Sequence, residues 1–221
     1  MTRDELLALL AGTIAALALP HPARVALDGV DAAGKTTLAD ALAPLIERRG
    51  RQVIRASADD FQRPRAARYA RGRLSPEGYY EDAFDYPLLR EALLGPLGPG
   101  GGRRYRAQAF DERRDEPIDA PHQEAPADAV LLVDGVFLQR PELAGCWDLV
   151  VFVDVPFETS LARALERDAA DFGGAEAVRE RYARRYIPAQ RRYLADCRPR
   201  ERADLVVANG DPARPELIVR S

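Results

Sequence analysis

Apolar residues along this chain form short continuous runs that alternate with longer segments of helical spacing. The continuous runs occupy residues 24–27, 52–57, 129–133, 149–153 and 205–208. Strands that are apolar on both faces are typical of a parallel sheet covered on both sides. Their alternation with helical segments predicts an α/β fold with a five-stranded parallel sheet and helices on both faces.

The helical segments are bounded by capping residues and breakers. Thr2 and Glu5 form a capping box, which predicts a helix over residues 3–18 within an N-terminal element of residues 1–20. Pro44 lies inside the next helical segment, so we expect a kink or break near residues 40–43. Further helices are expected at 85–94, 157–170 and 175–197, a hairpin arm at 103–106, and a loop at 112–127.

A phosphate-binding motif follows the first apolar run. The segment Gly29-Val30-Asp31-Ala32-Ala33-Gly34-Lys35-Thr36 has the spacing G-x-x-x-x-G-K-T. Its glycines allow a turn in which backbone N–H groups surround phosphate oxygens, while the lysine reaches the β- and γ-phosphates and the threonine ligates Mg²⁺. We therefore predict a P-loop NTPase that binds ATP and Mg²⁺, with Thr37 also at the nucleotide.

Lysine use supports this interpretation. Of the 32 lysine and arginine residues, Lys35 is the only lysine. A compact ammonium fits among phosphates where a planar guanidinium would crowd them. The absence of any other lysine also excludes an N-K-x-D guanine motif, so a conventional GTPase is ruled out and ATP is favoured over GTP.

Charge and hydropathy exclude two classes of partner. The net charge is −3, because 35 acidic residues outnumber the basic ones, and this gives no general attraction to nucleic acid. The apolar stretch 6–19 is too short to cross a bilayer, and Asp4 and Glu5 do not suit a signal peptide. We therefore expect neither nucleic-acid nor membrane binding.

Cysteine and histidine offer little chemistry. Cys146 and Cys197 lack metal-site spacing, which indicates a reducing, cytoplasmic location. His21 and His122 each lie beside a proline and are expected on the surface.

Two predicted strands end in carboxylates. Asp59 and Asp60 follow the second strand, and Asp134 follows the third. Ligands of open α/β sheets bind at this carboxyl edge, so Asp134 is a candidate metal ligand and Asp59 a candidate base. Asp59 could instead cap a helix or pair with a nearby arginine, and Asp60 is its local competitor.

Two groups of arginines could meet anionic groups. Arg163 and Arg167 are four residues apart on one predicted helix, suited either to closing over a triphosphate or to a charged outer face. Residues 63–75 contain five arginines, for which a solvated face is favoured over a flap that contacts an anionic substrate.

Taken in order, these motifs resemble the uridine kinase-like family of P-loop small-molecule kinases, which is related to phosphoribulokinase and pantothenate kinase. The matching segments are 28–37, 57–61, 82–85, 133–138, 153–156, Arg167-Asp168, Tyr182 with Pro188, and 203–205. The resemblance implies that residues 1–221 form a single P-loop kinase domain with a small acceptor-side region at 59–127 and a lid with its following helix at 157–197.

The resemblance also implies roles for individual residues. Lys35 and Thr36 become phosphate and Mg²⁺ residues, Asp59 the base that faces the acceptor hydroxyl, and Arg163 and Arg167 catalytic lid arginines. Aromatic and acidic residues expected at the acceptor are Asp59, Phe61, Tyr79, Tyr80, Phe84, Tyr105 and Phe110. Tyr79 stands where the family has a substrate Asp, and the base-reading His is missing around residues 110–114, so we expect weak uridine selectivity.

The expected function is ATP-dependent phosphoryl transfer to a hydroxyl of a small molecule, with uridine or cytidine as the first candidate acceptor. Pantothenate, a sugar, nicotinamide riboside or another polyol is the alternative. A P-loop regulatory protein that hydrolyses nucleotide without an acceptor is the alternative from another class. The sequence leaves the oligomeric state open, including a homo-oligomer.

Overall fold

The computed structural model describes residues 1–219 and contains a central sheet of six strands. The strand order is β10 (Glu216–Val219), β9 (Leu205–Ala208), β8 (Leu149–Asp154), β1 (Ala23–Gly29), β7 (Val130–Gly135) and β2 (Val53–Ser57). Five strands are parallel as predicted, whereas β10 pairs antiparallel with β9. The prediction of five strands is therefore wrong by one, because the chain turns back after β9 and pairs once more.

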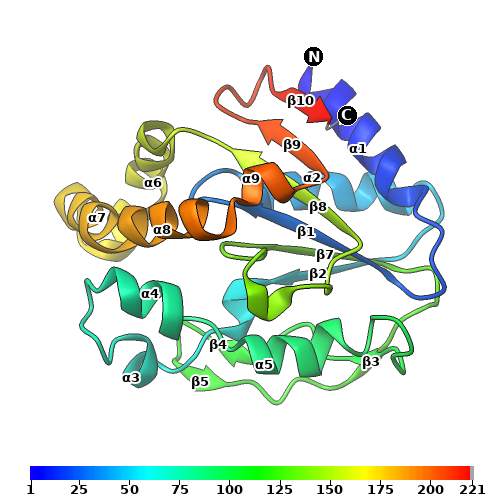
Figure 1. Cartoon of the computed structure of the whole chain (residues 1–221), viewed down its shortest axis with the longest axis horizontal. Coiled ribbons are helices and arrows are strands. Elements are labelled where there is room, and N and C mark those ends of the chain that lie inside the picture. Colours follow the sequence, from blue (N-terminus) through cyan, green and yellow to red (C-terminus); the bar gives the residue numbers. More distant parts are fainter. Residues whose placement is uncertain (220–221) are drawn as a thin grey trace.

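Helices cover both faces of this sheet (Figure 1). Val25 and Leu27 of β1 face a core shared with α1 (Arg3–Ala15) and α2 (Lys35–Glu47). Ala26 faces the opposite core, which is shared with α4 (Pro76–Asp82), α5 (Tyr86–Leu89) and α8 (Ile187–Cys197). Because successive side chains of a strand point to opposite faces of the sheet, this buried strand contributes residues to the cores on both sides.

The helix α2 runs through Pro44 without interruption, so the expected break is absent. Pro44 and Asp40 are both exposed. The Asp40 carbonyl, which loses its helical N–H partner to the proline, can therefore bond to water instead.

At the other end of the domain core, His21 is buried against Asp148, which corrects its expected surface position, while His122 is exposed.

The segment between β2 and β7 forms a separate set of small elements below the sheet in Figure 1. It contains the 3₁₀ turn η1 (Ala58–Phe61), α3 (Arg65–Arg68), α4, α5 and the π-helical η2 (Arg90–Leu94). Two short antiparallel pairs follow, β3 (Arg104–Tyr105) with β6 (Gln123–Glu124) and β4 (Phe110–Asp111) with β5 (Glu116–Pro117). A short strand, β3, lies at 103–106 as expected, but it pairs with β6 and not with the next strand along the chain, and the predicted loop 112–127 contains β5 and β6.

Between β8 and β9 the chain is helical, as predicted. α6 (Phe157–Phe172) ends at Gly173, whose φ of +85° reverses the chain into α7 (Ala175–Arg181). The π-helical η4 (Tyr182–Tyr186) joins α7 to α8, and α9 (Pro199–Arg202) precedes β9; the 3₁₀ turn η3 (Pro141–Leu143) lies after β7. No helix in residues 1–219 is long and apolar enough to span a membrane.

Candidate active site

The P-loop connects β1 to α2 in a conformation that requires its glycines. Gly29 has a φ of +152°, and a Cβ there would lie 2.4 Å from the Val153 carbonyl oxygen. Lys35 is buried, and its Nζ donates to the Val30 carbonyl at 2.6 Å. Burial lowers the pKa of Lys35, and the nearby Asp31 opposes this shift. The ammonium therefore lies inside the loop, where phosphate oxygens would be bound.

Asp28 anchors the start of this loop. It is fully buried, and its carboxylate accepts hydrogen bonds from the Tyr193 hydroxyl, from Gln139 Nε2 at 3.0 Å and from the Gly29 N–H at 2.8 Å. Burial raises the pKa of Asp28. The sequence assigned no role to Asp28, because its two side-chain partners lie more than a hundred residues along the chain.

Thr36 and Asp134 meet at the carboxyl edge of the sheet. Thr36 Oγ1 donates to Asp134 Oδ2 at 2.6 Å, and Arg55 contacts the other carboxylate oxygen at 2.9 Å. A hydroxyl and a carboxylate are the hard oxygen ligands that Mg²⁺ prefers, and this ion usually takes its remaining ligands from water and substrate phosphates. Within the described residues, no group of three or more acidic, histidine or cysteine side chains is arranged to hold a metal ion.

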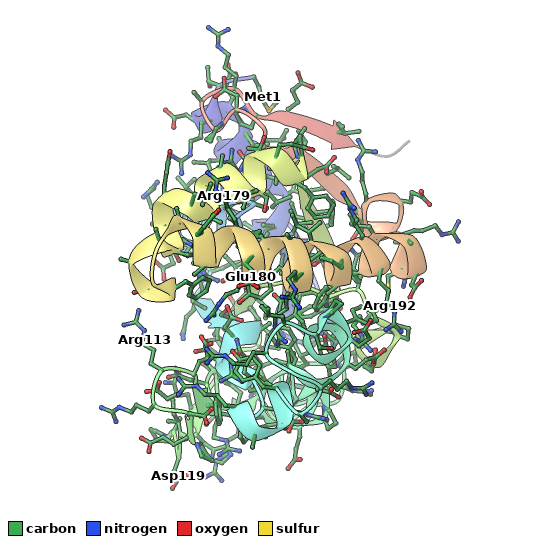
Figure 2. The ribbon with its side chains drawn as sticks, turned by 90° about the vertical axis from the view of Figure 1, so that its left-hand side faces the viewer. Met1, Arg113, Asp119, Arg179, Glu180 and Arg192 are labelled. Atoms are coloured by element: carbon green, nitrogen blue, oxygen red, sulfur yellow. The ribbon has the colours of Figure 1, made fainter. Side chains whose placement is uncertain are left out.

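A cleft of about 620 Å³ opens beside the P-loop. It is lined on one side by α3, α4 and the β4–β5 turn, and on the other by α6, η4 and the P-loop residue Asp31. Figure 2 looks onto this side of the molecule. The helices α6 to α8 cross the middle of the view, the elements between β2 and β7 lie below them, and Arg113, which lines the cleft, is labelled at the left. Residues of the segments 59–127 and 157–197 therefore line one space.

Asp59 lies in this cleft on η1, directly after β2. Asp59 is exposed at the cleft surface, and the partial loss of solvation between the walls raises its pKa to about 6, opposed by a hydrogen bond that Gln62 Nε2 donates at 2.8 Å. Its neighbour Asp60 is used differently, because it accepts from the Ser57 N–H at 3.2 Å and from Gln108 Nε2 at 2.9 Å. Asp60 thus completes the capping box of η1, whereas Asp59 has neither a capping bond nor an ion pair within the described residues.

Asp31 projects into the same cleft from the P-loop. Tyr79 donates its hydroxyl to the Asp31 carboxylate at 3.1 Å, and Gln190 Nε2 donates to it as well. Gln190 Oε1 also accepts the Asp31 N–H at 3.2 Å, and Ser160 Oγ donates to the Asp31 carbonyl at 2.6 Å. Burial raises the pKa of Asp31, and Lys35 opposes the shift.

The two lid arginines point to different places. Arg163 donates to the carbonyls of Ala33 at 3.3 Å and Asn209 at 2.7 Å, so it joins the P-loop to the segment after β9. Arg167 lines the cleft, where its Nε contacts Asp168 at 2.6 Å. Of these two arginines, Arg167 lines the cleft and Arg163 lines the hollow on the other side of the P-loop.

Of the aromatic residues expected at the acceptor, Tyr79 lines the cleft. The others are buried in the core behind it, namely Phe61, Tyr80, Phe84, Tyr105 and Phe110. Tyr80 contacts Cys197 Sγ and Tyr105 donates to Gln123 Oε1, both away from the cleft. None of these five side chains lines the cleft.

Other aromatic and cationic residues take their place. Tyr69, Tyr182 and Tyr186 line the cleft, and the guanidinium of Arg185 stacks over Tyr69 with a 5.0 Å separation from the ring centre. Arg68 is buried and bonded to Gln62, Glu112 and Asp115, so the solvated-face interpretation of residues 63–75 is wrong for this arginine. Tyrosines four residues apart before Pro188 were the signal in the sequence for this wall.

A second hollow, of about 210 Å³, lies on the other side of the P-loop. It is lined by Gly34 and Thr37, by Arg3, Leu6 and Leu7 of α1, and by Arg163, Asn209 and Pro212. Asn209 Nδ2 donates to the Ala33 carbonyl at 2.8 Å, which fixes the segment after β9 against the P-loop. Its apolar walls and its position next to Thr37 suit a nucleotide base.

Comparison with known proteins agrees with this arrangement. The family model described as "Phosphoribulokinase / Uridine kinase family" matches residues 25–213. The uridine kinase of Lactobacillus helveticus is 29% identical over 196 residues, covering 87% of this chain and 89% of the relative. The solved structure of a possible uridine kinase from Bacillus stearothermophilus superimposes with a TM-score of 0.71 at 25% identity, covering 92% of this chain and 97% of the other. A candidate fructose transport system kinase from Silicibacter sp. TM1040 gives a TM-score of 0.71 at 27% identity, covering 86% and 94% of the two chains.

Proposed function

This chain belongs to the phosphoribulokinase / uridine kinase family and is an ATP-dependent small-molecule kinase, and we propose that it phosphorylates a hydroxyl of a nucleoside. The observation that carries the proposal is Asp59, a carboxylate without an ion pair in the described structure, at the P-loop end of a cleft with aromatic walls. A base at this position faces the hydroxyl that would attack the γ-phosphate.

The nucleotide side supplies charge and orientation. The P-loop N–H groups and Lys35 bind the β- and γ-phosphates of ATP, and Lys35 exchanges its bond with the Val30 carbonyl for phosphate oxygens. The adenine lies in the hollow between Thr37, α1 and the segment after β9. This side therefore places the γ-phosphate at the mouth of the acceptor cleft.

Thr36 and Asp134 would hold Mg²⁺, which fits their oxygen chemistry and their 2.6 Å separation. An ion held there would supply positive charge to neutralise the negative charge that develops on the phosphates. Arg55 keeps the Asp134 carboxylate oriented toward Thr36 through the second oxygen. Arg167 adds positive charge from the cleft side, beside the transferring group.

Asp59 acts on the acceptor. With a pKa of about 6, its carboxylate is ionised at neutral pH and is still basic enough to accept the proton of the attacking hydroxyl. Gln62 holds one carboxylate oxygen at 2.8 Å and leaves the other for the acceptor. The proton leaves the hydroxyl as its oxygen bonds to the γ-phosphorus and ADP departs.

The walls of the cleft favour an acceptor with a flat ring. Tyr69, Tyr79 and Tyr186 present rings in the cleft, and nucleosides combine such a ring with several hydroxyls. The uridine kinase relative supports the same class. A sugar or other polyol is the alternative acceptor, which the similarity to a candidate fructose transport system kinase favours.

A panel of nucleosides, sugars, pantothenate and polyols, assayed by ADP formation, tests the proposal. Addition of a true acceptor raises ATP turnover well above the rate with ATP alone, and the product carries the phosphate on a hydroxyl. If ATP turnover is the same with every acceptor as without one, the chain is a nucleotide hydrolase and the proposal fails.

A further inference from the structure

Three carboxylates that line the acceptor cleft have no arginine partner in the described residues, and one of them, Asp171, is exposed near the end of α6. Asp168 is paired with Arg167, and Glu112 with Arg68, whereas no ion pair to Asp31 or Asp59 exists in residues 1–219. Asp59 is accounted for as the base, whereas Asp31 favours the charged form of Lys35 and also lines the cleft. We propose that Asp31 binds a second hydroxyl of the acceptor, so that this kinase requires a polyhydroxylated substrate.

The position of Asp31 is fixed before any acceptor arrives. Gln190 is buried, and its amide bonds both the carboxylate and the N–H of Asp31, while Tyr79 donates to the carboxylate from the opposite element, α4. These contacts come from two separate parts of the chain, α4 and α8. The carboxylate is therefore preorganised, which lowers the entropy lost when a ligand binds.

The carboxylate retains capacity for a ligand. An ionised carboxylate offers about four acceptor sites, and Tyr79 and Gln190 are its two side-chain donors in the described structure. The ligand must supply further donors, and it must not carry a negative charge at this point, because Asp31 already raises the pKa of the neighbouring Asp59. Neutral hydroxyl groups meet both conditions.

The chemistry of the two carboxylates differs by position. Asp59 follows β2 at the cleft floor, whereas Asp31 belongs to the phosphate loop itself. A hydroxyl held by Asp31 thus fixes the acceptor relative to the γ-phosphate, and the reacting hydroxyl falls to Asp59. The inference rests on the proposed function and narrows it: an acceptor that has lost the hydroxyl bound by Asp31 binds poorly even though its reactive hydroxyl is intact.

The test is a thermodynamic cycle that combines removal of the Asp31 charge with removal of one hydroxyl group from the substrate. Wild-type protein and Asp31→Asn are assayed with the best nucleoside acceptor and with analogues that each lack one non-reacting hydroxyl. A hydrogen bond to a charged group corresponds to about 10- to 100-fold in affinity, so one analogue should raise the acceptor KM of wild type by that factor. In Asp31→Asn the KM for the parent acceptor should rise similarly, and removal of the same hydroxyl should add little more.

Two controls separate this role from a structural one. Asp31→Asn removes a negative charge beside the phosphates, so calorimetry should find ATP binding unchanged or tighter, whereas damage to the P-loop would weaken it. Asp196→Asn makes the same change on the exposed end of α8 and should leave the acceptor KM unaltered.

The outcomes distinguish the inference from the proposed function. If the losses from the analogue and from Asp31→Asn multiply fully, or if wild type accepts all single-deletion analogues equally well, Asp31 does not bind the acceptor although the kinase assignment stands. If no acceptor accelerates ATP turnover in wild type, the proposed function itself is wrong. The wild-type analogue series decides the point even if Asp31→Asn fails to fold.

Discussion

Thr36 Oγ1 and Asp134 Oδ2 lie 2.6 Å apart, joined by a hydrogen bond across the carboxyl ends of neighbouring strands. The register that pairs Leu27 of β1 with Asp134 of β7 brings the Asp134 carboxylate beside the start of α2. A metal between the P-loop threonine and this acid would replace their direct bond with two bonds to the ion.

Asp134→Asn should therefore change the metal dependence first. We expect the Mg²⁺ concentration for half-maximal activity to rise about tenfold or more, because an amide oxygen carries no full negative charge for the ion. The measurement is a Mg²⁺ titration of ADP formation at saturating ATP, together with calorimetry of Mg²⁺–ATP binding. An unchanged titration would remove Asp134 from the metal site.

Lys35→Arg should abolish phosphoryl transfer although it conserves charge. Lys35 is enclosed by its loop and reaches the Val30 carbonyl, so a planar guanidinium has no space to enter without displacing the backbone. We expect kcat to fall about 100-fold or more, while circular dichroism and the melting temperature stay near those of wild type. A variant that retained most of its kcat would contradict the assigned role of this lysine.

Asp59→Asn separates a catalytic carboxylate from a structural one. Loss of the base should lower kcat by about 10²- to 10⁴-fold with ATP binding nearly intact. Because Asp59 accepts one hydrogen bond from Gln62 in the described structure, stability should change little. Asp60→Asn is the matched control: its amide oxygen can still accept from the Ser57 N–H, so both the unfolding free energy and the rate should change little.

The pH profile tests the same residue. The Asp59 pKa of about 6 lies above the ordinary value for aspartate, so the protonated, inactive form accumulates as the pH falls through that value. For wild type we expect kcat/KM to be level above about pH 7 and to fall tenfold per pH unit below about pH 6. In Asp59→Asn the residual rate should lose this acidic limb.

The base-side hollow predicts an effect of the N-terminal helix on ATP. Leu7 of α1 lines this hollow, whereas Leu9 on the opposite side of the helix is 47% exposed. Leu7→Trp should fill space needed by the adenine and raise the KM for ATP about tenfold, with kcat at saturation little changed. Leu9→Trp is the control, and equal ATP KM values in the two variants would place the base elsewhere.

The parts of the site that sequence could predict are those encoded within a few residues. The P-loop, Asp59 after its strand and the break at Gly173 each depend on neighbours in the chain, and the structure has the loop and the helix break where they were expected. The same holds for the capping box of α1. In these places local geometry needs particular residue types, so the pattern is readable.

The remaining parts depend on contacts between distant segments. Gln190 lies 159 residues from Asp31, and no spacing rule connects them. Aromatic residues show the same limit, because Tyr79 and Phe84 belong to one segment yet one lines the cleft and the other lies in the core. Which side an aromatic ring faces is decided by packing between elements, and hydrophobic content alone does not record it.

Ser160 on α6 and Gln190 on α8 both bond to the backbone of Asp31. The segment from α6 through α7 to α8 is therefore hydrogen-bonded near both of its ends to a single residue of the phosphate loop. Its turn at Gly173-Gly174 lies farthest along the chain from these two hydrogen bonds. A segment tied in this way is expected to move most at its turn and least at its two tied ends. Amide hydrogen exchange should thus be fastest around the glycine turn and slowest beside Ser160 and Gln190.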